Sequence, residues 1–181
     1  LEDHAAATGS QLLELLRQQG VQGRVVMAED PEAPNLVQLA ECAGLGTISP
    51  VLGLLLHPEF GPWISLRFAL LLEGEPFGRL KDAELADAFQ PCRNCSKPCI
   101  KACPALAFDG QGGQSFEACA HWRHAGGCGG GCDVRRACPV GAEHRYGPNE
   151  ERFRHAYSLH MMRRHFGLGM WRFVPKTVRQ R

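Results

Sequence analysis

The chain has 181 residues, of which 44% are hydrophobic and 22% are charged, and its formal net charge is +1. This length accommodates one large domain or two small ones, and the composition is ordinary for a globular protein. No apolar run approaches the roughly 20 residues of a membrane-spanning helix, and no basic leader with an apolar segment is visible. We therefore expect a protein of the reducing cytoplasm that does not associate with membranes.

The small net charge conceals an asymmetry along the chain. Residues 1–90 carry 13 acidic and 5 basic side chains, whereas residues 135–181 carry 11 basic and 3 acidic ones. A basic C-terminal part can neutralise the acidic front half of its own chain, an acidic redox partner or a nucleic acid. All three interpretations are kept at this point.

The first predicted element is a helix over residues 8–19. Thr8 and Gln11 make the T-x-x-Q pattern of a capping box, and Gly20 follows as an end signal. The helix is expected to present one apolar side, which consists of Leu12, Leu13, Leu15 and Leu16.

Further elements are expected before the cysteine-rich part of the chain. In order, they are a buried strand over residues 23–27, a turn over residues 28–31, a helix that follows Pro34 and ends at Gly44, a strand over residues 63–72, and a short helix over residues 82–89 with Asp82 as its N-cap. Cys42 lies on the apolar stripe of the second helix, so we expect it to be a small buried side chain.

Eight of the nine cysteines lie between residues 92 and 138, in two sets that each end on Cys-Pro. Iron in iron–sulfur clusters is bound by deprotonated thiolates that approach from different directions, and closely spaced cysteines supply several of them from one loop. Eight thiolates are what two [4Fe-4S] clusters need. The predicted ligands are Cys92, Cys95, Cys99, Cys103, Cys119, Cys128, Cys132 and Cys138.

The doubled Cys-Pro ending resembles that of two-cluster bacterial-type ferredoxins, in which the last cysteine of each run ligates the other cluster. The resemblance implies two sets of ligands, namely Cys92, Cys95, Cys99 and Cys138 for the first cluster, and Cys103, Cys119, Cys128 and Cys132 for the second. The second run is looser than the family form, and its GGCGGGC stretch suits a close backbone approach to a cluster as well as a plain flexible loop.

Two other interpretations of the cysteines remain open. Zinc is bound by cysteine alone or together with histidine, and His121, His124 and His144 lie nearby. Disulfides are a further alternative, although the cysteine count is odd and Cys-Pro endings have no role in a bridge.

Helices are also expected around and after the second set of cysteines. Ser115 is the predicted N-cap of a helix that carries Cys119 one turn before Arg123, and Trp122 either shields a cluster or packs in the core. A last long helix is expected to begin after Asn149 as N-cap and to pack through the stripe of Phe153, Tyr157 and Met161. His155, His160 and His165 recur every five residues and do not share one face. The tail that follows, from Trp171 to Arg181, mixes aromatic and basic residues and can bind a nucleic acid or lie against the chain.

A second resemblance lies just before the cysteines. The sequences AGLG at residues 43–46, a leucine run, and HPEFGPW at residues 57–63 are similar in kind and order to the segment of epoxyqueuosine reductases that precedes their ferredoxin-type domain. With CPVGAEHRYGPN at residues 138–149, they resemble short ferredoxin-like proteins related to those reductases, over residues 25–150.

The reductases of that family bind a corrinoid in an α/β domain, and their clusters supply electrons to it. The first half of that domain has no counterpart in this sequence. Counted back from AGLG, Asp30 falls where the family places a catalytic aspartate, and its alternative role is that of a turn residue. Thr47, Ile48 and Ser49 stand where the family has an aromatic residue and a lysine.

Taken together, these features predict an α+β protein with three parts: a short α/β segment at residues 1–90, a small, mostly helical ferredoxin-type domain at residues 91–147 packed on it, and a helix with a basic tail at residues 148–181. We expect an electron-transfer protein with two [4Fe-4S] clusters that relays single electrons to a reductase or cofactor, together with a redox partner protein. The alternatives are a divergent corrinoid-dependent reductase, which is an oxidoreductase, and a zinc-structured module that binds nucleic acid. No Walker, G-x-S-x-G or H-E-x-x-H motif indicates another chemistry.

Overall fold

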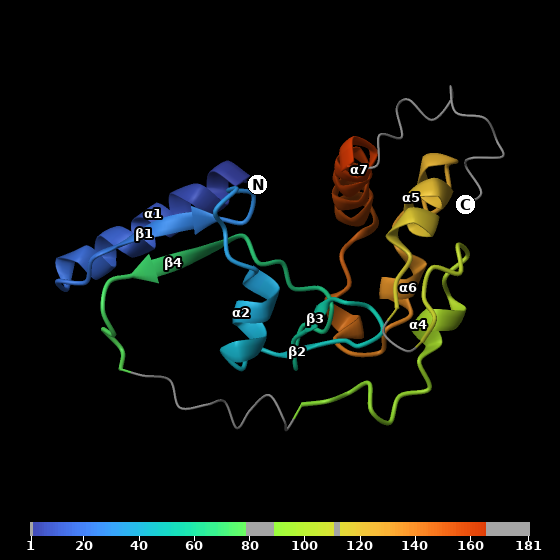
Figure 1. Cartoon of the computed structure of the whole chain (residues 1–181), viewed down its shortest axis with the longest axis horizontal. Coiled ribbons are helices and arrows are strands. Elements are labelled where there is room, and N and C mark those ends of the chain that lie inside the picture. The colour runs from blue at the N-terminus through green and yellow to red at the C-terminus, as the bar shows by residue number, and fades with distance from the viewer. Residues whose placement is uncertain (1, 79–88, 111–112, 166–181) are drawn as a thin grey trace. The chain divides into compact units, whose positions relative to one another are not determined.

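The computed structural model describes residues 2–78, 89–110 and 113–165. In these residues the chain has an α+β fold with six α-helices, one short 3₁₀ helix and two small antiparallel sheets (Figure 1). None of the described helices combines the length and the apolar composition that crossing a bilayer requires. Residues 82–88 of the helix predicted at 82–89, and the basic tail from Trp171 to Arg181, lie outside the described residues.

The chain divides into two compact units. The first unit comprises Leu1–Ile48, Leu54–Pro58 and Ile64–Gln90, and the second comprises Ser49–Gly53, Glu59–Trp63 and Pro91–Arg181. The second unit therefore contains all eight clustered cysteines, and it also takes in two short segments of the part of the chain that precedes them. The last helix belongs to this same unit and not to a separate segment.

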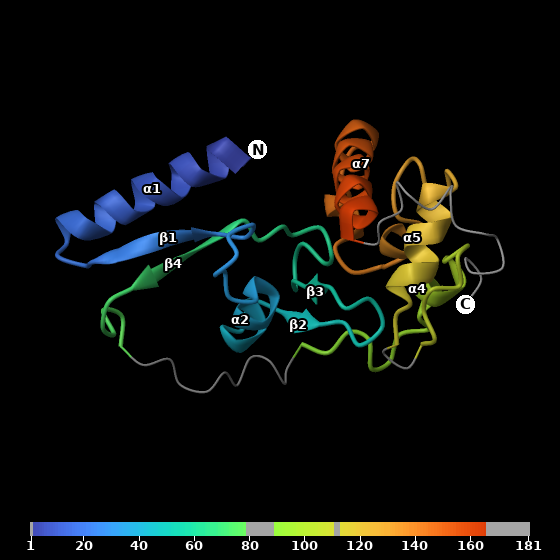
Figure 2. The same cartoon turned by 45° about the horizontal axis from the view of Figure 1, so that its top comes forward.

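In the first unit, helix α1 (Glu2–Gln18) packs on a two-stranded sheet formed by β1 (Gly23–Met27) and β4 (Phe68–Leu72) (Figure 2). The strands are antiparallel, with Gly23 opposite Leu72. The buried residues of α1 are Ala5, Gly9 and Leu13, which follow one another at intervals of four and share one face. A methyl group on Gly9 would press on Val25, so the small residues of this face let the helix approach the sheet closely.

The structure corrects the prediction for this first helix. Helix α1 begins at Glu2, six residues before Thr8, and Thr8 Oγ1 donates to the carbonyl of His4 within the helix, at 2.9 Å. Thr8 is therefore not an N-cap. Leu12 and Leu15 are exposed and not part of the packed side, because the face that meets the sheet is set by the small residues.

Helix α2 (Leu36–Cys42) and two short strands complete the first unit. The side chain of Asn35 caps α2 by accepting hydrogen bonds from the N–H groups of Val37 and Gln38. Strands β2 (Thr47–Ile48) and β3 (Leu55–Leu56) form the second antiparallel pair. Both strand pairs that the structure describes in this unit are antiparallel.

Of three predictions for the first unit, one is confirmed and two are corrected. The predicted strand at residues 23–27 is confirmed, and Asp30 closes the turn after it by accepting a hydrogen bond from the N–H of Met27, at 2.8 Å. The predicted strand at residues 63–72 is shorter, since β4 begins at Phe68. Cys42 is exposed, so the expectation that it is buried is wrong.

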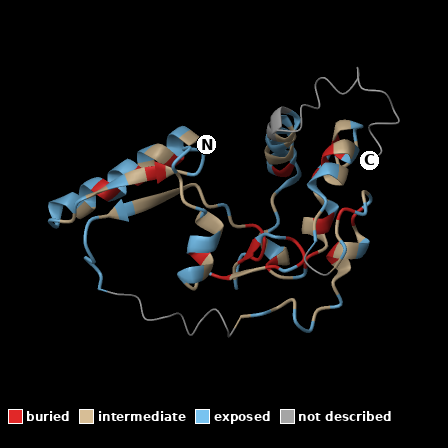
Figure 3. Ribbon diagram, viewed as in Figure 1, coloured by how far each residue is buried: buried red, intermediate tan, exposed pale blue. Residues whose placement is uncertain are grey.

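The second unit is built from short helices joined by loops. In chain order they are α4 (Pro98–Lys101), α5 (Phe116–His124), α6 (Asp133–Arg136), the 3₁₀ helix η1 (Ala142–His144) and α7 (Pro148–His165). Helix α4 contacts α6, and α5 contacts α7. The ribbon in Figure 3 marks buried residues in red. The buried residues of the second unit are mostly small, and they include Cys99, Cys103 and Cys138.

The predicted start of α5 is confirmed, because the hydroxyl of Ser115 accepts a hydrogen bond from the N–H of Ala118. The predictions for α7 are wrong in two respects. The helix begins at Pro148, so Asn149 is not its N-cap. Phe153 and Tyr157 are exposed and do not pack on the unit.

Candidate metal centre

The clustered cysteines fall into two groups, according to which of their thiol groups interact electrostatically with one another. In the first group, the thiol of Cys99 interacts with those of Cys138 and Cys92, and the thiol of Cys138 interacts with those of Cys92 and Cys95. Cys138, at the end of the second cysteine run, therefore lies near three cysteines of the first run.

The second group has the complementary membership. The thiol of Cys119 interacts with those of Cys132, Cys103 and Cys128. Interactions between Cys128, Cys132 and Cys103 connect the remaining members. Cys103, at the end of the first run, thus joins cysteines that follow it in sequence. This crossed grouping is the one that the ferredoxin resemblance implies.

The two runs reach their Cys-Pro endings through the same local structure. Helices α4 and α6 each have four residues and end at an alanine C-cap, which is Ala102 in α4 and Ala137 in α6. The N–H of the next residue, Cys103 or Cys138, donates to the carbonyl three residues earlier, at 3.3 and 3.2 Å. Because α4 contacts α6, these repeated turns bring the two runs together.

Hydrogen-bond donors are directed at most of the sulfur atoms. The N–H of Lys97 donates to Cys95 Sγ and the N–H of Ala107 donates to Cys103 Sγ, both at 3.3 Å. The other thiols with a donor are Cys99 from the backbone of Ile100, Cys128 from the side chain of Trp122, Cys132 from the backbone of Val134 and Arg135, and Cys138 from the backbone of Val140. Such donors favour the thiolate over the thiol, and the thiolate is the form that binds metal.

Burial acts in the opposite direction on these thiols. It raises the pKa of five cysteines, and their neighbouring thiols add to the rise because like charges repel. These five are Cys99, Cys119, Cys128, Cys132 and Cys138. Burial therefore disfavours the thiolate form of these five cysteines, and positive charge placed among them would offset this cost.

The backbone is strained beside the cysteines. Among the described residues, the non-glycine residues with positive φ are Lys97, Leu106 and Cys128, at 53°, 49° and 53°. This conformation costs about 1–2 kcal/mol for an L-residue. Strain of this kind gathers at functional sites, where the surroundings fix an unusual chain path.

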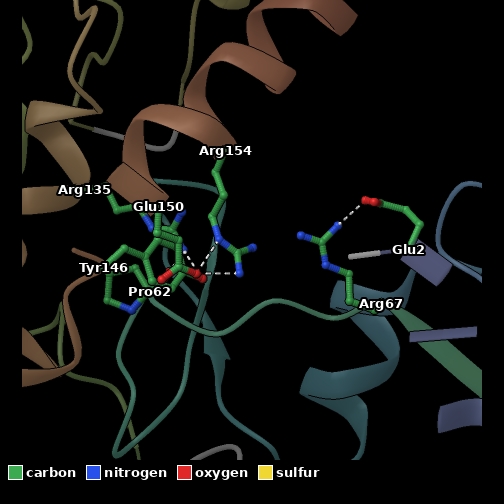
Figure 4. A network of polar contacts seen from close by, with 7 residues as sticks. All are labelled: Glu2, Pro62, Arg67, Arg135, Tyr146, Glu150 and Arg154. Carbon is green, nitrogen blue, oxygen red and sulfur yellow. Dashed lines mark hydrogen bonds and ion pairs between the residues drawn. The ribbon is translucent and has the colours of Figure 1, made fainter. Parts of the chain in front are cut away.

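In the second unit, two arginine side chains stack with the rings of Trp63 and Tyr146. Figure 4 draws Arg135, Tyr146 and Arg154 of this stack. The guanidinium of Arg135 lies 4.8 Å from the ring centroid of Trp63 and 4.9 Å from that of Tyr146, and it donates to the carbonyl of Pro62. The guanidinium of Arg154 lies 4.4 Å from the ring centroid of Tyr146 and pairs with Glu150 at 2.8 Å. These contacts fasten Pro62 and Trp63 to the cysteine-rich segment of the same unit. The pair of Arg67 and Glu2 in the same figure belongs to the first unit.

Two glycines make the same junction possible. Gly61 and Gly141 both have positive φ, at 54° and 61°. A methyl group on Gly61 would collide with the carbonyl of Val140, and one on Gly141 would collide with the backbone of Phe60. The backbone of the turn therefore lies directly against the loop after Cys138.

Sequence reasoning missed one polar residue of the first group. Ser49 is 1% exposed, its hydroxyl accepts from the N–H groups of Val51 and Leu52, and its Oγ lies 3.4 Å from Cys92 Sγ. Its sequence position, in a loop far from the cysteines, carried no signal for this contact. The segment Ser49–Gly53, which Ser49 begins, groups with the cysteines in the second unit.

The alternatives to a cluster have the following status in the structure. None of the nine cysteines is in a disulfide. Among the described side chains, no group of three or more His, Cys, Asp or Glu is arranged to hold a metal ion. Of the histidines near the cysteines, His121 pairs with Glu117 at 3.6 Å, and His144 packs edge-on against Phe60. Trp122 is 42% exposed, so it is not a core residue.

Comparisons of the chain with protein-family models, curated proteins and solved structures found no match.

Proposed function

We propose that the second unit is a ferredoxin-type domain that holds two [4Fe-4S] clusters and serves in electron transfer. The crossed grouping of the eight thiols carries this proposal. Cys92, Cys95, Cys99 and Cys138 would hold one cluster, and Cys103, Cys119, Cys128 and Cys132 the other. When bound, the clusters supply reversible one-electron chemistry. A cluster separates its four ligands more widely than a single ion does, because iron and sulfide occupy the space between them.

The composition of the interior supports a metal-dependent fold. Among the described residues of the second unit, the buried apolar side chains are those of Val51, Leu52, Pro62, Trp63, Cys99, Cys103, Ala107, Ala120, Val134 and Cys138. A core with so few large side chains stabilises a domain of this size only weakly. Metal ligation contributes directly to the folding free energy of such a domain.

The residues around the thiols have defined tasks in this proposal. Backbone N–H groups such as those of Lys97 and Ala107 stabilise anionic sulfur. Ser49 holds the loop before the cysteines against Cys92. The stack of Arg135 with Trp63 and Tyr146 fixes the loop beyond Cys138. A redox partner protein would be the source or the recipient of the electrons, in a reducing compartment that keeps thiols free.

Metal analysis of protein purified without oxygen tests the proposal. We expect about eight iron and eight sulfide ions per chain, together with the broad visible absorption of iron–sulfur proteins that bleaches on reduction. Zinc without acid-labile sulfide would contradict it and support the zinc-structured alternative. A bound corrinoid, seen in the absorption spectrum, would support the reductase alternative.

The crossed grouping makes a sharper prediction for one cysteine. Cys138→Ser is expected to remove or weaken the cluster of Cys92, Cys95 and Cys99 while the second cluster is retained, so iron and sulfide fall by about half. Cys42→Ser is the matched control, because Cys42 is exposed and belongs to neither group. Mössbauer or electron paramagnetic resonance spectra would show which cluster is lost. Loss of the cluster of Cys128 and Cys132 alone would contradict the grouping.

A further inference from the structure

Arg123 is a buried base beside the second thiol group. It follows Cys119 by four residues on α5, so both side chains leave the same face of the helix. Arg123 is 6% exposed, and its charge interacts with the thiols of Cys119, Cys132 and Cys128. The base that interacts with Cys138 of the first group is Arg145, which is exposed. Solvent screens Arg145 far more than it screens Arg123.

The hydrogen bonds of Arg123 do not neutralise its charge. Its guanidinium donates to Ser158 Oγ and Met162 Sδ, both at 2.9 Å, and to the backbone carbonyl of His155. All three acceptors are uncharged. A guanidinium remains protonated in proteins, and burying it without an anion is strongly unfavourable. The thiolates of the second group are the anions with which it interacts.

We propose that Arg123 is the buried counter-ion of the second thiolate group and raises the reduction potential of the cluster held there. This inference rests on the proposed function. Reduction adds one negative charge to a cluster, and a nearby buried cation stabilises the more negative state. Arg145 contributes less to the first group because it is exposed. The two sites are therefore electrostatically unequal. Arg123 acts on the second cluster through its charge and is not a ligand of it.

Potentiometric titration followed by electron paramagnetic resonance tests this role. Arg123→Gln removes the charge and keeps a side chain that can donate to α7, whereas Arg123→Lys keeps the charge. We expect Arg123→Gln to shift one of the two reduction steps to lower potential and to leave the other in place. Arg123→Lys is expected to restore most of that shift.

Two control variants separate charge from packing. Ser158→Ala removes one hydrogen bond of Arg123 without altering any charge, so both reduction steps should stay at their wild-type potentials. Arg145→Gln removes the exposed base near the first group, and it should move the other step by a smaller amount than Arg123→Gln moves its own. Ser158→Ala reproducing the shift of Arg123→Gln would overturn the proposal.

Every outcome for the two Arg123 variants is informative. If Arg123→Gln loses the second cluster and Arg123→Lys retains it, the site requires the positive charge and the proposal is supported. If both variants lose it, or if Arg123→Gln keeps both clusters at unchanged potentials, the proposal is overturned. Failure of the proposed function is distinguishable, because it would appear in the wild-type protein as an absence of iron and sulfide.

Discussion

His155 illustrates how the second unit constrains a single titratable group. The pKa of His155 is lowered from 6.5 to about 4, mainly by burial and next by the nearby charge of Arg123. Arg136 acts in the same direction, whereas Glu151 and Asp133 raise the pKa. The folded protein therefore keeps His155 neutral at pH values where the unfolded chain protonates it.

This shift predicts a pH dependence of stability. Between pH 6.5 and about 4 the unfolded state binds more protons than the native state at His155, so stability falls as the pH falls through this window. The slope from one such group is at most about 1.4 kcal/mol per pH unit. Urea unfolding of wild type and His155→Gln across this range should show the steeper loss in wild type. Parallel curves for the two proteins would mean that His155 titrates normally.

At the scale of elements, α7 is held in the second unit by polar side-chain contacts. Glu151 Oε1 accepts from the N–H of Cys132 at 3.2 Å, and Glu151 Oε2 accepts from Nε of Arg136 at 2.8 Å. The Glu151 side chain is 8% exposed, and that of Arg136 is 40% exposed. Together with the contacts of Arg123 to Ser158 and to Met162, this packing explains why the aromatic stripe of the helix remains outside.

The anchoring of α7 can be tested by comparing two adjacent glutamates. Glu151→Gln removes the charge of a buried carboxylate, which weakens its pair with the half-exposed Arg136 and the acceptor for Cys132, so we expect it to lower the free energy of unfolding by about 1–3 kcal/mol. Glu150→Gln should change it by no more than about 0.5 kcal/mol, because the pair of Glu150 with Arg154 is on the surface, with Glu150 48% exposed. Urea titration of both variants measures the difference. Equal effects would show that burial does not distinguish the two carboxylates.

At the scale of the whole molecule, the two units differ in what stabilises them. The first unit has its own apolar core, which includes Leu13, Val26, Leu55 and Leu56. The second unit buries three cysteines among small side chains. Its folding is therefore expected to depend on cluster ligation, whereas the folding of the first unit is not.

On the proposed function, removing the clusters should affect the two units differently. After chelation of iron under oxidising conditions, we expect amide hydrogen exchange to accelerate throughout residues 91–165. Protection in α1, β1 and β4 should persist, because their core contains no cysteine. Hydrogen exchange measured by mass spectrometry on the holo and apo forms checks this. Equal loss of protection in both units would show that they unfold together.

Local signals in the sequence were enough to predict several elements. Residues 23–27 form the predicted strand, Ser115 caps α5, and Gly44 follows α2, because each depends on neighbours within a few positions. Local signals were misleading where packing chooses among several candidate faces. Leu12 and Leu15 of α1 and the aromatic residues of α7, Phe153 and Tyr157, were expected on a buried side and are exposed, whereas Leu13 is buried as expected.

The spacing of the cysteines and their doubled Cys-Pro endings by themselves determined which thiols form the candidate site. The tertiary structure alone decided what surrounds them. Ser49 reaches Cys92 from a distant loop, and Arg123 faces the second group while its hydrogen bonds go to α7. Contacts of this kind join residues far apart in the chain, and they depend on how helices and loops pack in space. Ligand spacing, in contrast, is a local property that the order of residues expresses directly.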